Sequence, residues 1–246
     1  MIYLKLFDIE NNYLKYRYDK SEHIKPNVSL CDDNGKVYYN YRPDFNGHDY
    51  VDLGLPSGTL WATCNVGASK PSDAGLYFQW GDTVGYTAEQ VGNGDGKKKF
   101  AEDYSDYKWG TYQNFTKYIV SGATLELEDD AAHINMGGDW HMPTPEQIQE
   151  LLSGTTKGWT TQNNVKGRLF TSKKDNSKSI FIPAAGSAWN GSVVDSSGRG
   201  CVWSSMTVVK NSRYVQVLDF NSGNAYLNTT YYHNRCSGLS VRGVIG

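Results

Sequence analysis

Three stretches in the C-terminal third of the chain are rich in side chains that contact other molecules. They are GSAWNGSVVDSSGRG (186–200), TVVKNSRY (207–214) and NTTYYHNRCS (228–237). Tyr offers a large contact area with few rotatable bonds, and Ser, Asn and Gly adapt their hydrogen bonding, so evolved binding loops favour these types. The composition predicts a binding surface, and ordinary polar loops are the alternative interpretation.

Residue patterns for catalysis are scarce. His133 and His141 flank INMGGDW without the HExxH spacing, so we expect two hydrogen-bonded structural histidines. Ser57 in GLPSG does not complete a GxSxG nucleophile elbow, and no Gly-rich phosphate loop leads from a strand into a helix. We predict no catalytic residue and no cofactor.

The cysteines and acidic residues do not indicate a metal site either. Cys31, Cys64, Cys201 and Cys236 include no CxxC pair, so a zinc site is not expected. We expect free buried thiols, and one disulfide between distant cysteines remains the alternative. The acidic run at 126–130 precedes a predicted helix, where negative charge favours the helix N-terminus.

A helix at 144–154 is the clearest local element. Thr144 is expected as N-cap and Pro145 as first helical residue, and Gln147 completes a capping box. Ile148, Leu151 and Leu152 form its apolar stripe.

A second helix is predicted within LEDDAAHINMG (127–137). Ala131, Ala132 and Ile134 are expected to face the core, and Gly137 to end the helix.

The remaining elements are predicted to be short strands. RYVQVLDF and NAYLN (213–220 and 224–228) form a predicted hairpin, with Leu218 and Phe220 on one face and Val215 and Val217 on the other. Trp203 in CVWSS is expected in the core. SIFIPAAG is expected as a buried strand, and GLSVRGV (238–244) as one closing strand.

Residues 1–47 differ in pattern from the rest of the chain. An Asn-Gly turn within 32–35 separates VSLC from KVYYNY, which predicts a β-hairpin in a small N-terminal β segment. Residues 48–246 are expected to form one domain.

The amino-acid composition argues against some classes of function. The chain has 246 residues, a net charge of -2 and 13% aromatic residues, so it lacks the basic excess of a nucleic-acid binder. No apolar run approaches the roughly 20 residues of a membrane span, and no signal peptide is visible.

An ordered set of motifs carries a family resemblance over roughly 48–246. The motifs are YVDLGLPSGTLWATCNVGA (50–68), GLYFQWGDT (75–83), LELEDDAAHINMGGDWHMPTPEQIQELL (125–152), FIPAAG (181–186), WSS (203–205) and GLSVRGV (238–244). Together they resemble the major paralogous domain of gut-bacterial surface proteins, versions of which are the variable proteins of diversity-generating retroelements in bacteria and phages. The sequence departs from the family pattern at Cys201 and Cys236, where Tyr is common.

The resemblance implies an α+β, C-type-lectin-like fold related to the formylglycine-generating enzyme, built of short antiparallel strands and loops with two helices. It also implies a variable region at about 186–237, mutated through adenines in its codons. The ligand-binding residues that it implies are Ser187, Trp189, Asn190, Ser192, Arg199, Cys201, Asn211, Arg213, Tyr214, Asn228, Thr230, Tyr231, Tyr232, His233, Asn234 and Arg235.

The resulting expectation is a non-enzymatic display protein on a virion or cell surface, whose partner is a protein or glycan on another cell or virion. We expect Ala at Tyr231, Tyr232 and Arg235 to abolish binding with little effect on melting temperature. Two alternatives are a structural module of a virion or surface assembly, with residues 1–47 as its docking piece, and a formylglycine-generating-type enzyme. The sequence gives little support for the enzyme alternative, because no two cysteines lie close together along the chain. A calcium-dependent lectin is disfavoured because AWNG (188–191) has no acidic ligand.

Overall fold

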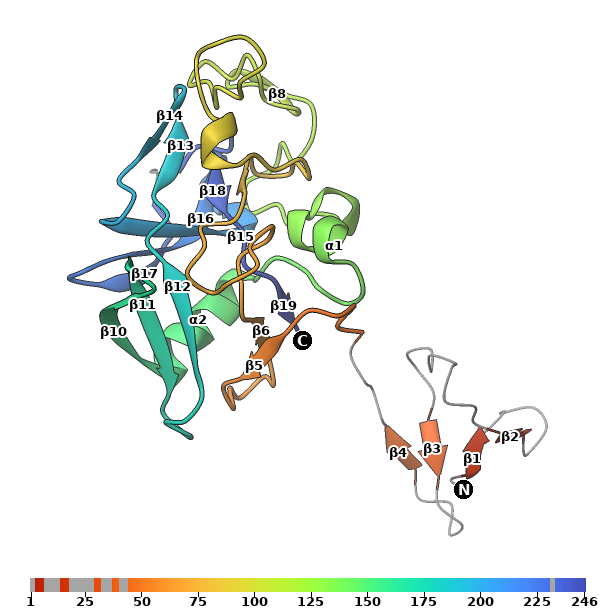
Figure 1. The fold of residues 1–246 in the computed structure, drawn as a ribbon. Coiled ribbons are helices and arrows are strands. Elements are labelled where there is room, and N and C mark those ends of the chain that lie inside the picture. The colour runs from red at the N-terminus through yellow and green to blue at the C-terminus, as the bar shows by residue number, and fades with distance from the viewer. Residues whose placement is uncertain (1–2, 7–13, 18–28, 32–36, 40–43, 231–232) are drawn as a thin grey trace. The chain divides into compact units, whose positions relative to one another are not determined.

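The computed structural model describes residues 3–6, 14–17, 29–31, 37–39, 44–230 and 233–246. The chain divides into two compact units, Met1–Asp44 and Phe45–Gly246, where the sequence predicts a boundary after residue 47. The first unit contains an antiparallel sheet of order β2-β1-β3-β4 (Figure 1). Its strands are β1 (Tyr3–Leu6), β2 (Leu14–Arg17), β3 (Ser29–Cys31) and β4 (Val37–Tyr39). The pairing of β3 with β4 confirms the predicted hairpin strands, while the turn itself lies outside the described residues.

The second unit is an α+β structure in which strands predominate (Figure 1). Its strands before the helices are β5 (Tyr50–Asp52), β6 (Leu60–Ala62), β7 (Tyr77–Phe78), β8 (Gly110–Thr111) and β9 (Asn114–Phe115). The helices in the described part are α1 (Ala131–Met136) and α2 (Pro145–Gly154), with short 3₁₀ turns at Ala88–Gln90 and Leu127–Asp129. The later strands are β10 (Thr155–Gln162), β11 (Val165–Ser172), β12 (Ser179–Pro183), β13 (Ser187–Trp189), β14 (Ser192–Val194), β15 (Arg199–Val208), β16 (Asn211–Asn221), β17 (Ala225–Asn228), β18 (Leu239–Ser240) and β19 (Val244–Ile245).

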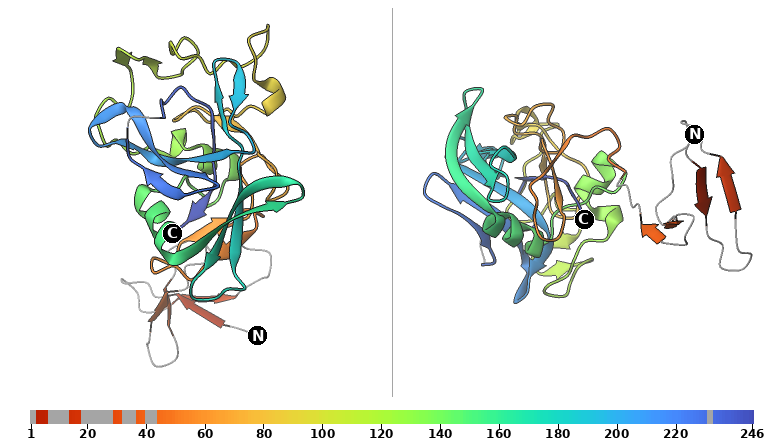
Figure 2. Two further views of the ribbon diagram at one scale, coloured as in Figure 1. Left: turned by 90° about the vertical axis from the view of Figure 1, so that its left-hand side faces the viewer. Right: turned by 90° about the horizontal axis from the view of Figure 1, so that it is seen from below.

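A five-stranded sheet of order β17-β16-β15-β18-β7 forms the centre of this unit. Its two long strands are buried on both faces, because Val215 and Val217 join one core cluster and Leu218 and Phe220 the other, as predicted. Trp203 is fully buried, which confirms its core position. Smaller sheets of order β10-β11-β12 and β19-β6-β5 flank the centre (Figure 2).

Helix α2 forms as its capping residues predict. The Thr144 Oγ1 accepts a bond from the Gln147 amide at 3.2 Å, and the Gln147 Oε1 accepts one from the Thr144 amide at 2.9 Å. Its apolar stripe packs into the cluster that contains Leu218 and Phe220. The helix therefore covers one face of the central sheet.

Helix α1 covers the opposite face, with one correction to the prediction. Ala131, Ala132 and Met136 are buried there, but Ile134 is 52% exposed. In a helix of six residues, Ala132 and Met136 are one turn apart and share the inward face, so Ile134 lies on the outer side. The predicted stop at Gly137 is confirmed by its positive φ of 70°.

The prediction of one closing strand is wrong, because this segment forms two short strands, β18 and β19. β18 pairs with β15 and β7, and β19 pairs with β6 in another sheet. Between them the chain passes close to α1, since a Cβ on Gly243 would lie 2.6 Å from the Met136 Sδ. The Arg242 guanidinium is buried in this crossing and donates to Asn65, Ala62 and Phe181.

Candidate functional site

The predicted contact residues lie on three neighbouring parts of the second unit. These parts are the β13–β14 hairpin, the β15–β16 pair and the segment 228–235 that leads to β18. The segment runs beside β16, because the Val215 amide donates to the His233 carbonyl at 3.0 Å and the Arg235 amide to the Arg213 carbonyl at 3.2 Å. Tyr231 and Tyr232 lie outside the described residues.

Arg213 is the centre of a group that we call the arginine–tyrosine patch: Tyr104, Tyr112, Arg213, Tyr214 and Asn234. The Arg213 guanidinium carbon lies 3.9 Å from the ring centre of Tyr112 and 5.5 Å from that of Tyr214. Its Nε donates to the Asn234 Oδ1 at 2.9 Å, and the Tyr104 hydroxyl donates to the same oxygen at 3.3 Å. Tyr112 is half exposed and Arg213 partly exposed, so a planar cation and an aromatic ring are offered together to solvent.

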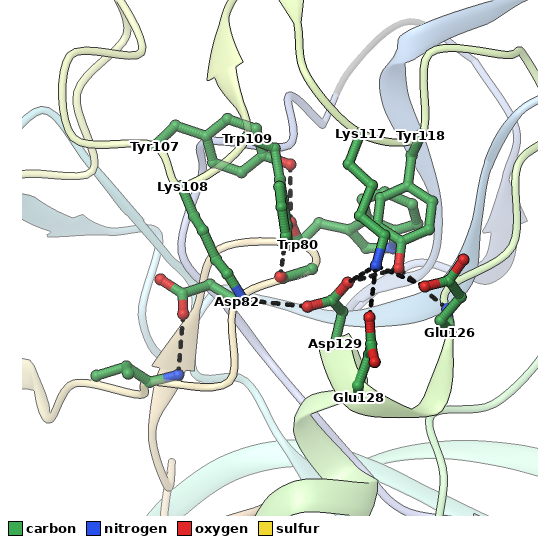
Figure 3. A network of polar contacts seen from close by, with 12 residues as sticks. Trp80, Asp82, Tyr107, Lys108, Trp109, Lys117, Tyr118, Glu126, Glu128 and Asp129 are labelled. Atoms are coloured by element: carbon green, nitrogen blue, oxygen red, sulfur yellow. Dashed lines mark hydrogen bonds and ion pairs between the residues drawn. The ribbon is translucent and has the colours of Figure 1, made fainter.

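Asp129 anchors the loop that carries Tyr112 through hydrogen bonds. This buried carboxylate accepts hydrogen bonds from Lys108, Lys117 and Tyr118, on both sides of the β8–β9 hairpin (Figure 3). Burial favours a higher pKa for Asp129, but the hydrogen bonds from Lys117, Tyr118 and Lys108 outweigh it and lower the pKa. Asp129 therefore fixes both ends of the loop.

The acidic run has two roles, one at the start of α1 as predicted and one around the Lys117 ammonium. Asp130 is the N-cap of α1 and accepts from the His133 amide, as a residue favouring the helix start should. Glu126, Glu128 and Asp129 instead surround the Lys117 ammonium at 2.6, 3.0 and 2.6 Å (Figure 3). The position between these three carboxylates is thus filled by a lysine.

Arg235 holds the same loop from the interior, which corrects its prediction as an exposed contact residue. Its side chain is fully buried, and its guanidinium donates to the carbonyls of Ser212, Lys117 and Tyr118. The guanidinium carbon lies 4.3 Å from the Phe115 ring centre. Since β16 contributes Ser212, Arg235 joins the loop to the central sheet.

The β13–β14 hairpin lies at the same end of the unit as the loop segment 85–125 (Figures 1 and 2). Asn190 occupies its turn with a φ of 46°, a region that Asn tolerates better than most residues. Its side chain bonds Glu102 twice, accepting from the amide at 2.9 Å and donating to the carboxylate at 3.2 Å. Trp189 packs partly buried against the cluster of Tyr104 and Tyr107. Asn190 and Trp189 therefore position the hairpin as well as bordering the surface.

The other predicted residues divide between the surface and the interior. Ser192 and Thr230 are exposed, and Ser187, Arg199 and Asn211 are partly exposed.

Cys201, Asn228 and His233 are buried, which corrects their prediction as contact residues. Their polar atoms face Asp219, which accepts from the Arg199 Nε at 2.8 Å and from the Asn228 Nδ2 at 3.1 Å. A carboxylate at that depth requires such partners, and these side chains supply them.

Cys201, Asp219 and His233 do not form a catalytic triad. The His233 Nε2 lies 3.9 Å from the Cys201 Sγ and 3.4 Å from an Asp219 oxygen, so one ring nitrogen faces both partners and the relay of a triad is missing. Burial raises the pKa of the Cys201 thiol, which keeps the sulfur protonated and weakly nucleophilic. Burial also lowers the pKa of His233.

Cys64, Cys201 and Cys236 are free, and the expectation of free buried thiols is confirmed for Cys201 and Cys236, whereas Cys64 is only partly buried. His133 and His141 bond the carbonyls of Trp140 and Met142 through their Nδ1 atoms, as expected of structural histidines. A groove of about 430 Å³ beside Arg199 is lined by Asn221, Tyr226, Leu227, Asn228, Thr229 and Thr230. Three residues of this lining, Arg199, Tyr226 and Asn228, bond Asp219.

Sequence reasoning missed Tyr104, Tyr112 and Asp219, and it gave Asp129 only a role at the helix N-terminus. The segment YSDYKWGTYQNFTKY (104–118) is as rich in aromatic and amide side chains as the three stretches considered, and this composition was the signal available for Tyr112. Asp219 had no such signal, since it lies in an apolar strand.

No family model, curated protein or solved structure matches this chain.

Proposed function

We propose that residues 45–246 form a C-type-lectin-like display domain that binds a protein or glycan ligand on a cell or virion surface through the arginine–tyrosine patch. The mainly antiparallel strands with two helices support this fold assignment. The patch combines Arg and Tyr, which are the residue types enriched at the energetic centres of interfaces. The stacking of Arg213 on the half-exposed Tyr112 is the observation that carries the proposal.

The support beneath the patch favours recognition by a rigid surface. Asp129 and Arg235 fix the loop of Tyr112 to the core and to β16, so little conformational entropy remains to be lost when a ligand binds. Arg213, Tyr214 and Asn234 of the patch are partly exposed and lie within the predicted variable region. Substitution there should cost little stability, as a diversified site requires.

A binding role is favoured over an enzymatic one by the chemistry of the titratable groups. The Cys201 thiol is buried and held protonated, and the patch holds no carboxylate, imidazole or lysine side chain. The virion or cell surface remains our proposed location, and the unit at residues 1–44 is our proposed attachment to a larger assembly. No helix in the described residues is long and apolar enough to cross a bilayer.

Binding of labelled protein to a glycan array and to a panel of bacterial cells tests the proposal. For any ligand found, Arg213→Ala and Tyr112→Ala should each weaken binding at least about 10-fold, as expected for hot-spot residues. The control is Lys166→Ala on β11, which removes an exposed cation elsewhere and should change affinity less than about threefold. Full affinity in both patch variants would contradict the proposal.

The neighbouring DNA offers an independent test of diversification. We expect a template repeat that matches the coding region for 186–237 except at adenines, beside a reverse transcriptase gene. Its absence from the locus would argue against a retroelement while leaving the binding experiment unaffected.

A further inference from the structure

Three metal-ligating side chains converge below the predicted contact surface. Cys201 on β15 and Asp219 on β16 are directly opposed in the register of the two strands, and His233 approaches them from the neighbouring segment. All three are buried, with exposed fractions of 2%, 1% and 5% for Cys201, Asp219 and His233. One ligand atom from each lies within 4.8 Å of the other two.

The distances match those of a tetrahedral zinc site. With metal–ligand bonds of about 2.0–2.3 Å, tetrahedral geometry places sulfur roughly 3.6 Å from either partner and nitrogen roughly 3.4 Å from oxygen. The Cys201 Sγ lies 3.9 Å from the Asp219 Oδ1 and 3.9 Å from the His233 Nε2, and that nitrogen lies 3.4 Å from the Asp219 Oδ2. The sulfur and nitrogen distances to Asp219 are to its two different oxygens, so the carboxylate must turn or bind through both oxygens to close the site.

We propose that Cys201, Asp219 and His233 bind one divalent transition-metal ion of the zinc class. A set of one thiolate, one imidazole and one carboxylate suits Zn²⁺ and leaves a fourth position open. On binding, the Cys201 sulfur releases its proton to solvent and forms a bond to the metal. This inference does not rest on the proposed display function.

Neighbouring side chains already contact two of the three ligands, Asp219 and His233. Asp219 accepts hydrogen bonds from Arg199, Tyr226 and Asn228, and such contacts orient a ligating carboxylate. The His233 ring lies edge-on to Trp203, with ring centres 6.3 Å apart and planes at 85°. Arg199 pairs with both oxygens of Asp219, so metal binding must displace part of this ion pair.

The groove beside Arg199 lies next to the residues that bond Asp219. Arg199, Tyr226 and Asn228 line this groove and also contact Asp219. The Arg199 side chain is 21% exposed, so it lies between solvent and the carboxylate.

Titration of the tag-free, chelator-treated full chain with Zn²⁺ tests the proposal, with the affinity measured against a competing chelator. We expect one equivalent per chain, and with Co²⁺ a thiolate-to-cobalt charge-transfer band together with the intense visible bands of tetrahedral coordination. Cys201→Ser should lose the charge-transfer band and weaken zinc binding at least 100-fold, and His233→Gln should weaken it similarly. Cys236→Ser is the matched control, since it removes another buried free thiol and should bind zinc like the wild type.

The wild-type titration decides the question even where a variant fails to fold. Absence of stoichiometric zinc binding by the folded wild type would overturn the proposal. So would equal binding by wild type and folded Cys201→Ser, or loss of the cobalt band in folded Cys236→Ser but not in Cys201→Ser.

Discussion

Replacing Arg235 by Ala tests whether this residue belongs to the scaffold. The substitution removes a buried guanidinium that donates to the carbonyls of Ser212, Lys117 and Tyr118. It also leaves a space beside the Phe115 ring, 4.3 Å from the guanidinium carbon. The loop of Tyr112 loses the side chain that joins its carbonyls at Lys117 and Tyr118 to β16.

The magnitude follows from the groups left without partners. A buried polar group that loses its hydrogen bond costs about 1–3 kcal/mol, and Arg235 satisfies three carbonyls. Relief of the buried charge and entry of water offset part of this sum, so we expect a loss of about 3–5 kcal/mol in the free energy of unfolding. For a unit of this size, the melting temperature should fall by roughly 6–20 °C.

Tryptophan fluorescence during urea and thermal unfolding is the appropriate assay. The seven tryptophans all lie between Trp61 and Trp203, so the signal reports on the second unit alone. Arg213→Ala is the matched control, because this partly exposed arginine lies two residues before β16 becomes buried, and its loss should cost less than about 1 kcal/mol. A melting temperature for Arg235→Ala within about 2 °C of the wild type would refute the assignment of Arg235 to the scaffold.

Other substitutions test separate parts of the fold. Thr144→Ala removes the cap of α2 and should cost about 1 kcal/mol in urea unfolding, and an unchanged midpoint would deny the cap a role. Gly200→Ala places a Cβ against the ring of Phe220 and should destabilise by about 1–3 kcal/mol, whereas Gly94→Ala, with no atom within 4 Å, should stay within about 0.5 kcal/mol. Because the folded pKa of Asp129 is lowered, its stabilisation is present above the unfolded value of about 3.9 and is lost as pH falls through the folded pKa. Unfolding free energies at several pH values should therefore fall more steeply below about pH 5 in the wild type than in Asp129→Asn, and parallel curves would contradict this.

The sequence by itself determined the local elements of this protein. The capping box of Thr144 and Gln147, the stop at Gly137 and the strand hairpin after Arg213 all formed as predicted. Each depends on contacts between residues close in the chain, so its signal is contained in a short window. The alternation of β16 side chains between the two faces of the sheet was visible for the same reason.

Only the tertiary structure decided which polar residues are exposed. Arg235 and His233 have the composition of contact residues, yet the packing of their segment against β16 buries both. The register of β15 against β16 opposes Cys201 to Asp219, and a loop from far earlier in the chain brings Tyr112 onto Arg213. Burial and convergence of this kind depend on strand register and long-range packing, which no local pattern of residues encodes.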